Sequence, residues 1–136
     1  KRGLISGEFW LIQSYSGDMI QAKDENDKIA FALPAEGAIF TADCFCIPTD
    51  AQNVDLAYEF INYMNRPDVA AKNVEFVKYR SPNTDAMKLV SEELKKNPSF
   101  NIPKETLDRC SPIFDLGGKN QLYTKAWDKV KSGKTE

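Results

Sequence analysis

The sequence contains no histidine, and this absence excludes several kinds of active site. Neither a Ser-His-Asp nor a Cys-His catalytic arrangement can be assembled within the chain, and neither can a zinc or iron site with histidine ligands. Long apolar runs are also missing, since the longest are far shorter than the roughly 20 residues that a membrane-spanning helix needs. The net charge is −2, with no long run of one sign. Because the basic residues are scattered, no nucleic-acid-binding surface is expected.

Cysteine is scarce, and the chain has an odd number of three. Cys44 and Cys46 lie two residues apart in a predicted strand, where a disulfide between them would be strained. They do not form the Cys-x-x-Cys pattern of redox and zinc sites. We therefore expect all three cysteines to be small core residues, and we expect neither a bound metal nor a cofactor.

The residues that are present have the composition of a globular protein, with 42% apolar and 28% charged. The 136 residues match the length of one domain and suffice to bury a core. The first residue is Lys1 rather than Met, so we expect a processed protein or a piece of a longer one.

Three apolar runs predict strands in the first third of the chain, at residues 9–13, 28–33 and 39–47. Asp43 interrupts the last run. Burying an unpaired carboxylate costs roughly several kcal/mol, so Asp43 needs a partner or a place at a cleft. Backbone N–H groups at the end of the strand are one such partner, and a cationic ligand is another.

The period changes to that of amphipathic helices from Asn53 onwards. Helices are predicted at residues 53–65, 67–76, 83–90, 92–96, 103–109 and 120–131, with Pro67 in a first turn and Asn83 and Ser91 as caps. Gly133 is expected to end the last helix. Early strands followed by helices indicate a mixed α/β fold with few strands.

A strand, a glycine-containing turn and the start of a helix are predicted around residues 9–22, with the helix beginning near Met19. The turn carries Tyr15 and Asp18, and a later loop presents Tyr79. An aromatic ring and a carboxylate three residues apart suit a cation better than an anion. Asp18 can instead favour the helix dipole, by about 0.3–1 kcal/mol, with the tyrosines as packing or surface residues.

No nucleophile paired with a base accompanies these carboxylates, and no glycine-rich phosphate loop is present. A carboxylate-using hydrolase is therefore a weaker hypothesis than a binding site. Acids at strand ends with aromatic rings nearby would hold ammonium groups and the methylenes between them. A small interaction module whose acidic loops bind a basic partner is a third hypothesis.

Several segments resemble the polyamine-binding proteins of bacterial ABC importers. They are Trp10-Leu-Ile-Gln-Ser-Tyr-Ser-Gly-Asp18, Pro34-Ala-Glu-Gly-Ala-Ile-Phe-Thr-Ala-Asp43, Asn62-Tyr-Met-Asn-Arg-Pro-Asp-Val-Ala70 and Lys125-Ala-Trp-Asp-Lys-Val-Lys-Ser-Gly133. The resemblance covers essentially the whole chain, but only the C-terminal part of the family's proteins, which are more than twice as long.

The resemblance implies which residues bind the ligand. Asp18 and Asp43 match positions that hold amine groups, Tyr15 matches an aromatic position, and Tyr79 matches a tyrosine that lines the pocket. Thr41 stands where the family usually has an aromatic ring.

The resemblance also implies an architecture. It is the C-terminal part of a type II periplasmic-binding-protein fold, in which two α/β lobes joined by strand crossovers close around the ligand. Residues 1–40 and 90–136 would belong to one lobe and residues 41–89 to the other. The ligand would be putrescine or spermidine, and a sugar or a metal chelate is the alternative.

The implied partners are an ABC permease and the missing N-terminal part of the protein. The protein would be exported to a periplasm or to the outer face of the cell membrane, with or without a lipid anchor, and it would not be an enzyme. Without its N-terminal part, the chain is expected to bind polyamines weakly or to fold only by associating with another chain, including a second copy.

Overall fold

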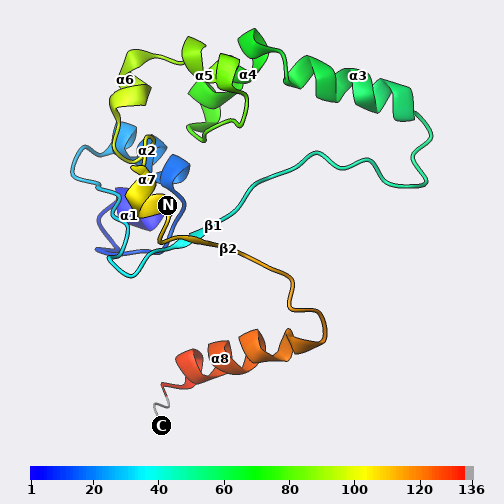
Figure 1. Cartoon of the computed structure of the whole chain (residues 1–136). Coiled ribbons are helices and arrows are strands. Elements are labelled where there is room, and N and C mark those ends of the chain that lie inside the picture. Colours follow the sequence, from blue (N-terminus) through cyan, green and yellow to red (C-terminus); the bar gives the residue numbers. More distant parts are fainter. Residues whose placement is uncertain (134–136) are drawn as a thin grey trace.

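A computed structural model of the chain describes residues 1–133. It is mostly helical, and its elements spread out instead of closing into one body (Figure 1). The helices are α1 (Arg2–Ile5), α2 (Ser16–Glu25), α3 (Val54–Met64), α4 (Pro67–Val77), α5 (Thr84–Leu89), α6 (Glu92–Lys96), α7 (Lys104–Leu107) and α8 (Gln121–Ser132). The 3-10 turn η1 (Gly117–Lys119) precedes α8, and the strands are β1 (Ile39–Phe40) and β2 (Ser111–Pro112).

Helix α2 lies between two separate apolar clusters. On one side, Ile20 packs into a cluster that it forms with α4, α5, α6 and the loop after α6. The other buried members of this cluster are Ala70, Ala71, Val74, Ala86, Val90, Leu94 and Phe100. On the other side Met19 and Ala22 meet Ile29, and Leu4, Ile5, Ile12 and Phe31 pack against them. Ile20 is therefore the buried residue through which α2 packs against α4, α5 and α6.

The helices from α3 onward confirm the sequence prediction closely. Pro67 is the first residue of α4, where its missing N–H group removes no helical bond. The side chain of Asn83 accepts the N–H groups of Asp85 and Ala86 at the start of α5, and Ser91 accepts that of Leu94 in α6. Local periodicity and capping were therefore sufficient to locate this part of the fold.

The predicted strands are largely absent, and this part of the prediction is wrong. Residues 9–13 and 28–33 form no strand, and of residues 39–47 only β1 is a strand, paired in parallel with β2. A strand needs a neighbour to bond its backbone groups, because an isolated extended segment leaves them to water. Apolar runs thus mark segments that are able to form strands. Within residues 1–133, however, only two residues of β1 pair with two residues of β2.

Gly37 allows the small sheet to form. The N–H group of Ser111 donates to the carbonyl of Ala38 at 2.9 Å, which brings the chain after α7 against the turn before β1. Gly37 has a φ of +106°, and a Cβ atom there would overlap the carbonyl group of Arg109. The segment that leads to α8 is therefore held against the turn before β1, at a position that only glycine fits.

Neither the expected single core nor the buried cysteines are found. Cys44 and Cys46 are exposed and Cys110 is half-buried, so the prediction that they are core residues is wrong. Asp43 is exposed too, in an extended segment between β1 and α3. A folded monomer of 15.3 kDa exposes about 7,100 Å², whereas this chain exposes 11176 Å². A large share of the surface that a domain of this size normally buries is open.

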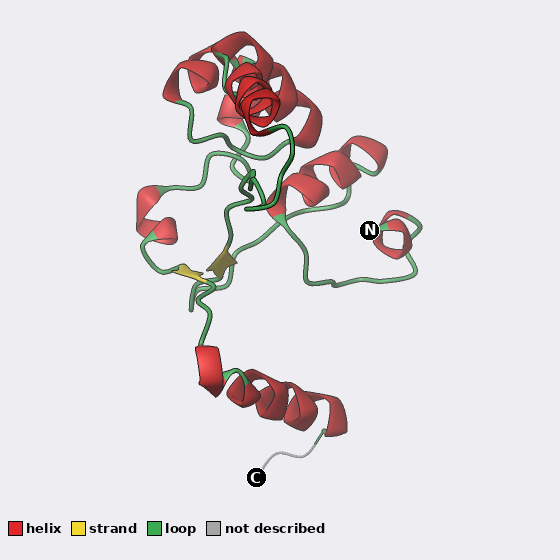
Figure 2. Cartoon of the chain, turned by 90° about the vertical axis from the view of Figure 1, so that its right-hand side faces the viewer, coloured by secondary structure: helices red, strands yellow, loops and turns green. Residues whose placement is uncertain are grey.

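Much of the open surface lies on two helices. Helix α3 projects from the start of α4, and α8 stands apart from the other helices, beyond the sheet (Figures 1 and 2). Neither helix has a buried residue. Each nevertheless carries large apolar side chains: Val54, Leu56, Tyr58, Phe60 and Tyr63 on α3, and Leu122, Tyr123, Trp127 and Val130 on α8. Such faces normally pack against other protein.

Candidate functional site

The candidate site is centred on Asp18 in the first turn of α2. The helix begins at Ser16, three residues earlier than predicted, so Asp18 lies near its positive end. Asp18 is half-buried, because the neighbouring Met19 and Ile20 insert into the two apolar clusters. The carboxylate is thus anchored by packing on both sides of its helix.

Tyr79 bonds to Asp18 twice, although 61 residues separate them. Its hydroxyl donates to Asp18 Oδ2 at 3.2 Å and accepts the N–H of Asp18 at 3.3 Å. The approach depends on Lys78, which adopts the left-handed conformation with a φ of 62° and turns the chain sharply at the end of α4. Gln21 Nε2 secures that turn by donating to the carbonyl of Val77 at 3.0 Å.

Tyr15 borders the same spot. It precedes α2 as its N-cap residue, with an extended backbone, and the residue is 59% exposed. Tyr15 lies close enough to Tyr79 to affect its pKa. The structure therefore brings together three of the five predicted site residues: Tyr15, Asp18 and Tyr79. A carboxylate bonded by one tyrosine, with a second tyrosine three residues before it, is chemically suited to an ammonium group.

The pKa of Tyr79 is raised, first because the hydroxyl is partly buried and then because the negative charge of Asp18 lies beside it. A tyrosine with a raised pKa holds its proton more tightly in the folded chain than in the unfolded one. Its contribution to stability is present below about pH 10 and is lost as the pH rises through the raised value. At neutral pH the hydroxyl therefore remains a donor to Asp18.

We expect this tyrosine to be visible in an alkaline titration of the full-length protein monitored by tyrosinate absorbance. One component should titrate above the ordinary value near pH 10, and Tyr79→Phe should remove it. Tyr58→Phe, on helix α3, should leave it in place. Persistence of the high-pH component in Tyr79→Phe would contradict the contact with Asp18.

Asp43 and Thr41 do not join the other three residues. Both are exposed on the segment that leaves β1 and runs away from α2 toward the start of α3 (Figure 1). Asp43 has no hydrogen bond or ion pair among the residues that the structure describes. Further along this segment, Phe45 makes an edge-to-face contact with Phe60 of α3, with ring centroids 5.8 Å apart. Ligand contacts from Thr41 and Asp43 stay predictions.

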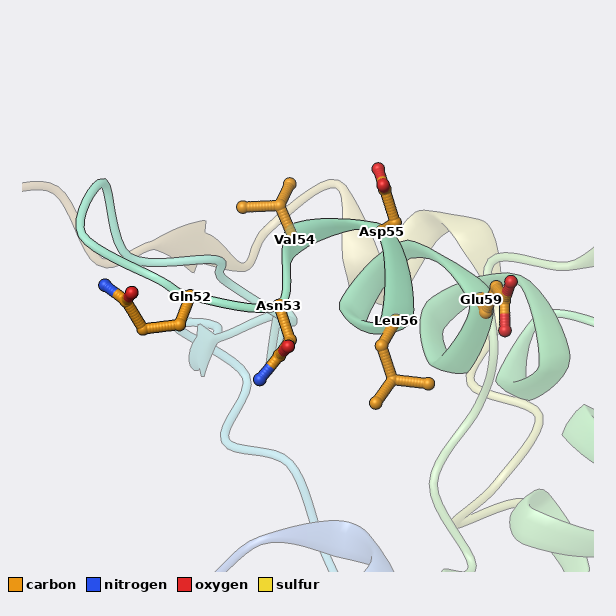
Figure 3. Close-up of a pocket in the computed structure, with 6 residues that line it drawn as sticks. All are labelled: Gln52, Asn53, Val54, Asp55, Leu56 and Glu59. Atoms are coloured by element: carbon orange, nitrogen blue, oxygen red, sulfur yellow. The ribbon is translucent and has the colours of Figure 1, made fainter.

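A hollow among the described residues lies away from the candidate site, at the start of α3. It is lined by exposed side chains that point outward in several directions: Gln52, Asn53, Val54, Asp55, Leu56 and Glu59 (Figure 3). None of these is a predicted site residue. Because every lining residue is exposed, the hollow is a surface depression that cannot enclose a ligand.

Within residues 1–133, no group of three or more His, Cys, Asp or Glu side chains is arranged to hold a metal ion. Every helix in the same range is too short or too polar to cross a membrane.

Gly17 is a residue of this site that sequence reasoning noted only as part of a turn. It is buried in the first turn of α2, directly under the ring of Tyr79. The available signal was a glycine inside a helix, where alanine would be more favourable by roughly 1 kcal/mol.

Comparison with known proteins identifies the family. The sequence profile of the family described as "Bacterial extracellular solute-binding protein" matches residues 1–102. The chain belongs to this family. As a solute-binding chain it is not an enzyme, as the sequence predicted, and its fold is of the type II periplasmic-binding class, seen in this chain as helices with a small parallel sheet.

This solute-binding chain is similar to polyamine-binding proteins. It is 36% identical to the putrescine-binding periplasmic protein PotF of Escherichia coli (strain K12), over 96% of the chain and 37% of that protein. The identity is 32% to the putrescine-binding periplasmic protein SpuD of Pseudomonas aeruginosa (strain UCBPP-PA14), over 96% of the chain and 38% of that protein. The chain is also 32% identical to the spermidine/putrescine-binding periplasmic protein of Escherichia coli (strain K12), over 96% of the chain and 37% of that protein. The resemblance found in the sequence is thereby confirmed, and the chain spans little more than a third of these relatives.

Proposed function

We propose that this chain is the C-terminal part of the polyamine-binding component of an ABC importer, which captures putrescine or spermidine between two lobes and delivers it to a permease. The observation that carries the proposal is the carboxylate of Asp18, a half-buried residue, which Tyr79 bonds and which Tyr15 precedes by three residues. The similarity to putrescine- and spermidine-binding proteins supports it.

The site is suited to one end of a polyamine. A primary ammonium group would donate to the Asp18 carboxylate through a charge-assisted hydrogen bond, which is stronger than a neutral one. The ring of Tyr15 would lie against the ammonium or the adjoining methylenes, an interaction of about 0.5–2 kcal/mol when water is excluded. A neutral sugar would gain neither the charge attraction nor the cation–π contact.

Asp43 would hold a second amine, with Thr41 beside it. This requires the segment after β1 to lie closer to α2 in the complete protein than it does in this chain, which closure of two lobes around a ligand would achieve. The lobe boundaries, residues 1–40 with 90–136 and residues 41–89, remain a prediction. They separate Ile20 from Val74, which share one cluster, and residues 134–136 lie outside the described chain.

The remainder of the protein is the partner that the open surface fits best. The excess of exposed area over a typical monomer is about 4,000 Å² on this chain alone, an amount that only an extensive, permanent interface would bury. We infer that the exposed faces of α3 and α8 pack against the part of the protein outside this chain. We propose that the protein acts in the periplasm or at the outer face of the membrane, which the periplasmic location of its relatives supports.

We expect the isolated chain to bind putrescine far more weakly than the full-length protein, because it holds only part of the pocket and exposes surfaces that favour self-association. Titration calorimetry on both proteins, with sedimentation to record their oligomeric state, measures the difference. Equal affinity in the two proteins would show that residues 1–136 contain the entire binding site.

Asp43→Asn in the full-length protein tests whether the second carboxylate takes part. We expect weaker binding of putrescine with an unchanged circular dichroism spectrum, because the variant removes a charge and preserves the shape of the side chain. Asp50→Asn, also exposed on this segment, is the matched control and should bind like the wild type. Unaltered putrescine affinity in Asp43→Asn would remove Asp43 from the binding site.

A further inference from the structure

The ring of Tyr79 lies against the bare backbone of Gly17. A Cβ atom at Gly17 would come within 2.7 Å of both Cε2 and Cζ of Tyr79, closer than carbon atoms pack. Gly17 is in α2, and its φ is not positive, so the backbone conformation does not require glycine there. What does require it is the close approach of the tyrosine ring.

The position of this ring determines the orientation of the Asp18 carboxylate. Tyr79 bonds Oδ2 of the carboxylate and also the N–H group of Asp18, so the phenol holds both the side chain and the backbone of that residue. No hydrogen bond to Oδ1 is found within residues 1–133. One oxygen is fixed and the other is open, which orients the carboxylate before a ligand arrives.

The chain before Tyr79 leaves the ring little choice of position. Lys78 turns in the left-handed conformation, and Gln21 of α2 holds the Val77 carbonyl at 3.0 Å. The backbone is therefore tied to α2 on one side of the ring, while the hydroxyl is tied to Asp18 on the other. A side chain at position 17 would have to displace the ring, because the helix beneath it is packed in two clusters.

We propose that Gly17 is a positioning residue for ligand binding: its missing side chain forms the seat of the Tyr79 ring, and Tyr79 in turn presents Asp18 to an ammonium group. The identity of the ligand in this inference rests on the proposed function. The seating of the Tyr79 ring on Gly17 does not depend on that function. Gly17 would act through Tyr79 and Asp18 and would not touch the ligand.

Gly17→Ala in the full-length protein tests two things separately: the seating of the Tyr79 ring and the binding of the ligand. Alanine is the better helix former, so we expect α2 to persist and the circular dichroism spectrum to be unchanged. The displaced ring should lose its contact with Asp18, and the high-pH tyrosine component should move back toward the ordinary value. Putrescine should bind about tenfold more weakly, as expected for loss of a hydrogen bond to a charged group.

Two further variants identify the cause. Tyr79→Phe keeps the ring and removes the hydroxyl, and it should weaken putrescine binding about as much as Gly17→Ala. In a Tyr79→Ala background there is no ring to displace, so adding Gly17→Ala should change the affinity less than about twofold. Such non-additivity is typical of residues that act as one unit.

Three results would overturn the inference. They are an unchanged tyrosine titration in Gly17→Ala, an unchanged putrescine affinity in that variant, and an equal loss of affinity whether or not Tyr79 is present. If the wild-type protein binds no polyamine, the proposed function and the ligand part of this inference both fail. The titration of Gly17→Ala then still decides whether Gly17 seats Tyr79.

Discussion

Replacing Asp18 with asparagine in the full-length protein should nearly abolish putrescine binding. Removing one partner of a buried, hydrogen-bonded charge pair costs about 2–5 kcal/mol. At 1.4 kcal/mol for each factor of ten, this is a loss of roughly 30-fold to several thousand-fold in affinity. We expect a large effect because Asp18 is half-buried and its carboxylate is held by Tyr79, so the ammonium group would lose a charged partner that is already oriented for it.

Calorimetry with putrescine measures this change, and Asp24→Asn provides the matched control. Asp24 is also on α2, but it is exposed and lies near the opposite end of the helix. It should leave affinity unchanged, apart from the small effect of one distant charge. Asp18→Asn also loses the favourable interaction with the helix dipole, about 0.3–1 kcal/mol of stability, so the fold should be checked by circular dichroism. Equal affinity in the Asp18→Asn and Asp24→Asn variants would remove Asp18 from the binding site.

Gly37→Ala should destabilise the protein more than any of the substitutions at the binding site. Two costs combine at this position. A left-handed backbone is unfavourable for alanine, by about 1–3 kcal/mol, and overpacking typically costs about another 1–3 kcal/mol. The overpacking is severe, because the atoms that a methyl group would meet belong to the backbone of Arg109 and cannot swing away. We expect the β1–β2 pairing to break and the free energy of unfolding to fall by about 2–6 kcal/mol.

Urea denaturation of the full-length protein measures this loss, and the chain contains a control that separates the two costs. Gly7 also has a positive φ, of +81°, but no atom lies within 4 Å of where its Cβ would be. Gly7→Ala therefore carries only the backbone cost and should be clearly milder. If both variants lose the same free energy, the contact between Gly37 and Arg109 is not a constraint in the complete protein.

The helical half of the fold was predictable because its signals are local. Asn83 and Ser91 cap helices through bonds to residues two or three positions away, and Pro67 favours a first turn wherever it occurs. Gly133 ends α8 in the left-handed conformation, as expected of a glycine in that place. None of these signals needs the rest of the protein.

The strand predictions failed because strand formation depends on neighbours that are distant in the sequence. Trp10 was assigned to a buried strand, yet it is 95% exposed. We infer that the apolar run around it packs against a surface outside this chain. The same holds for Cys44 and Cys46, whose burial requires a sheet around them. Apolar sequence predicts that a residue will be covered, but it does not say by which part of the protein.

The site was predictable in its members and not in its geometry. Asp18 and Tyr79 were both chosen as ligand-binding residues, but nothing in the sequence links them across 61 positions. The link depends on the left-handed turn at Lys78, a residue type with no preference for that conformation, and on the bare surface of Gly17. Both are products of tertiary packing around α2.

A crystal structure of the full-length protein with putrescine tests the central claim most directly. We predict one ammonium nitrogen about 2.7–2.9 Å from a carboxylate oxygen of Asp18, with Tyr79 bonded to the other oxygen and the ring of Tyr15 against the ligand. A ligand bound elsewhere, with Asp18 bonded only to Tyr79 and facing solvent, would contradict it.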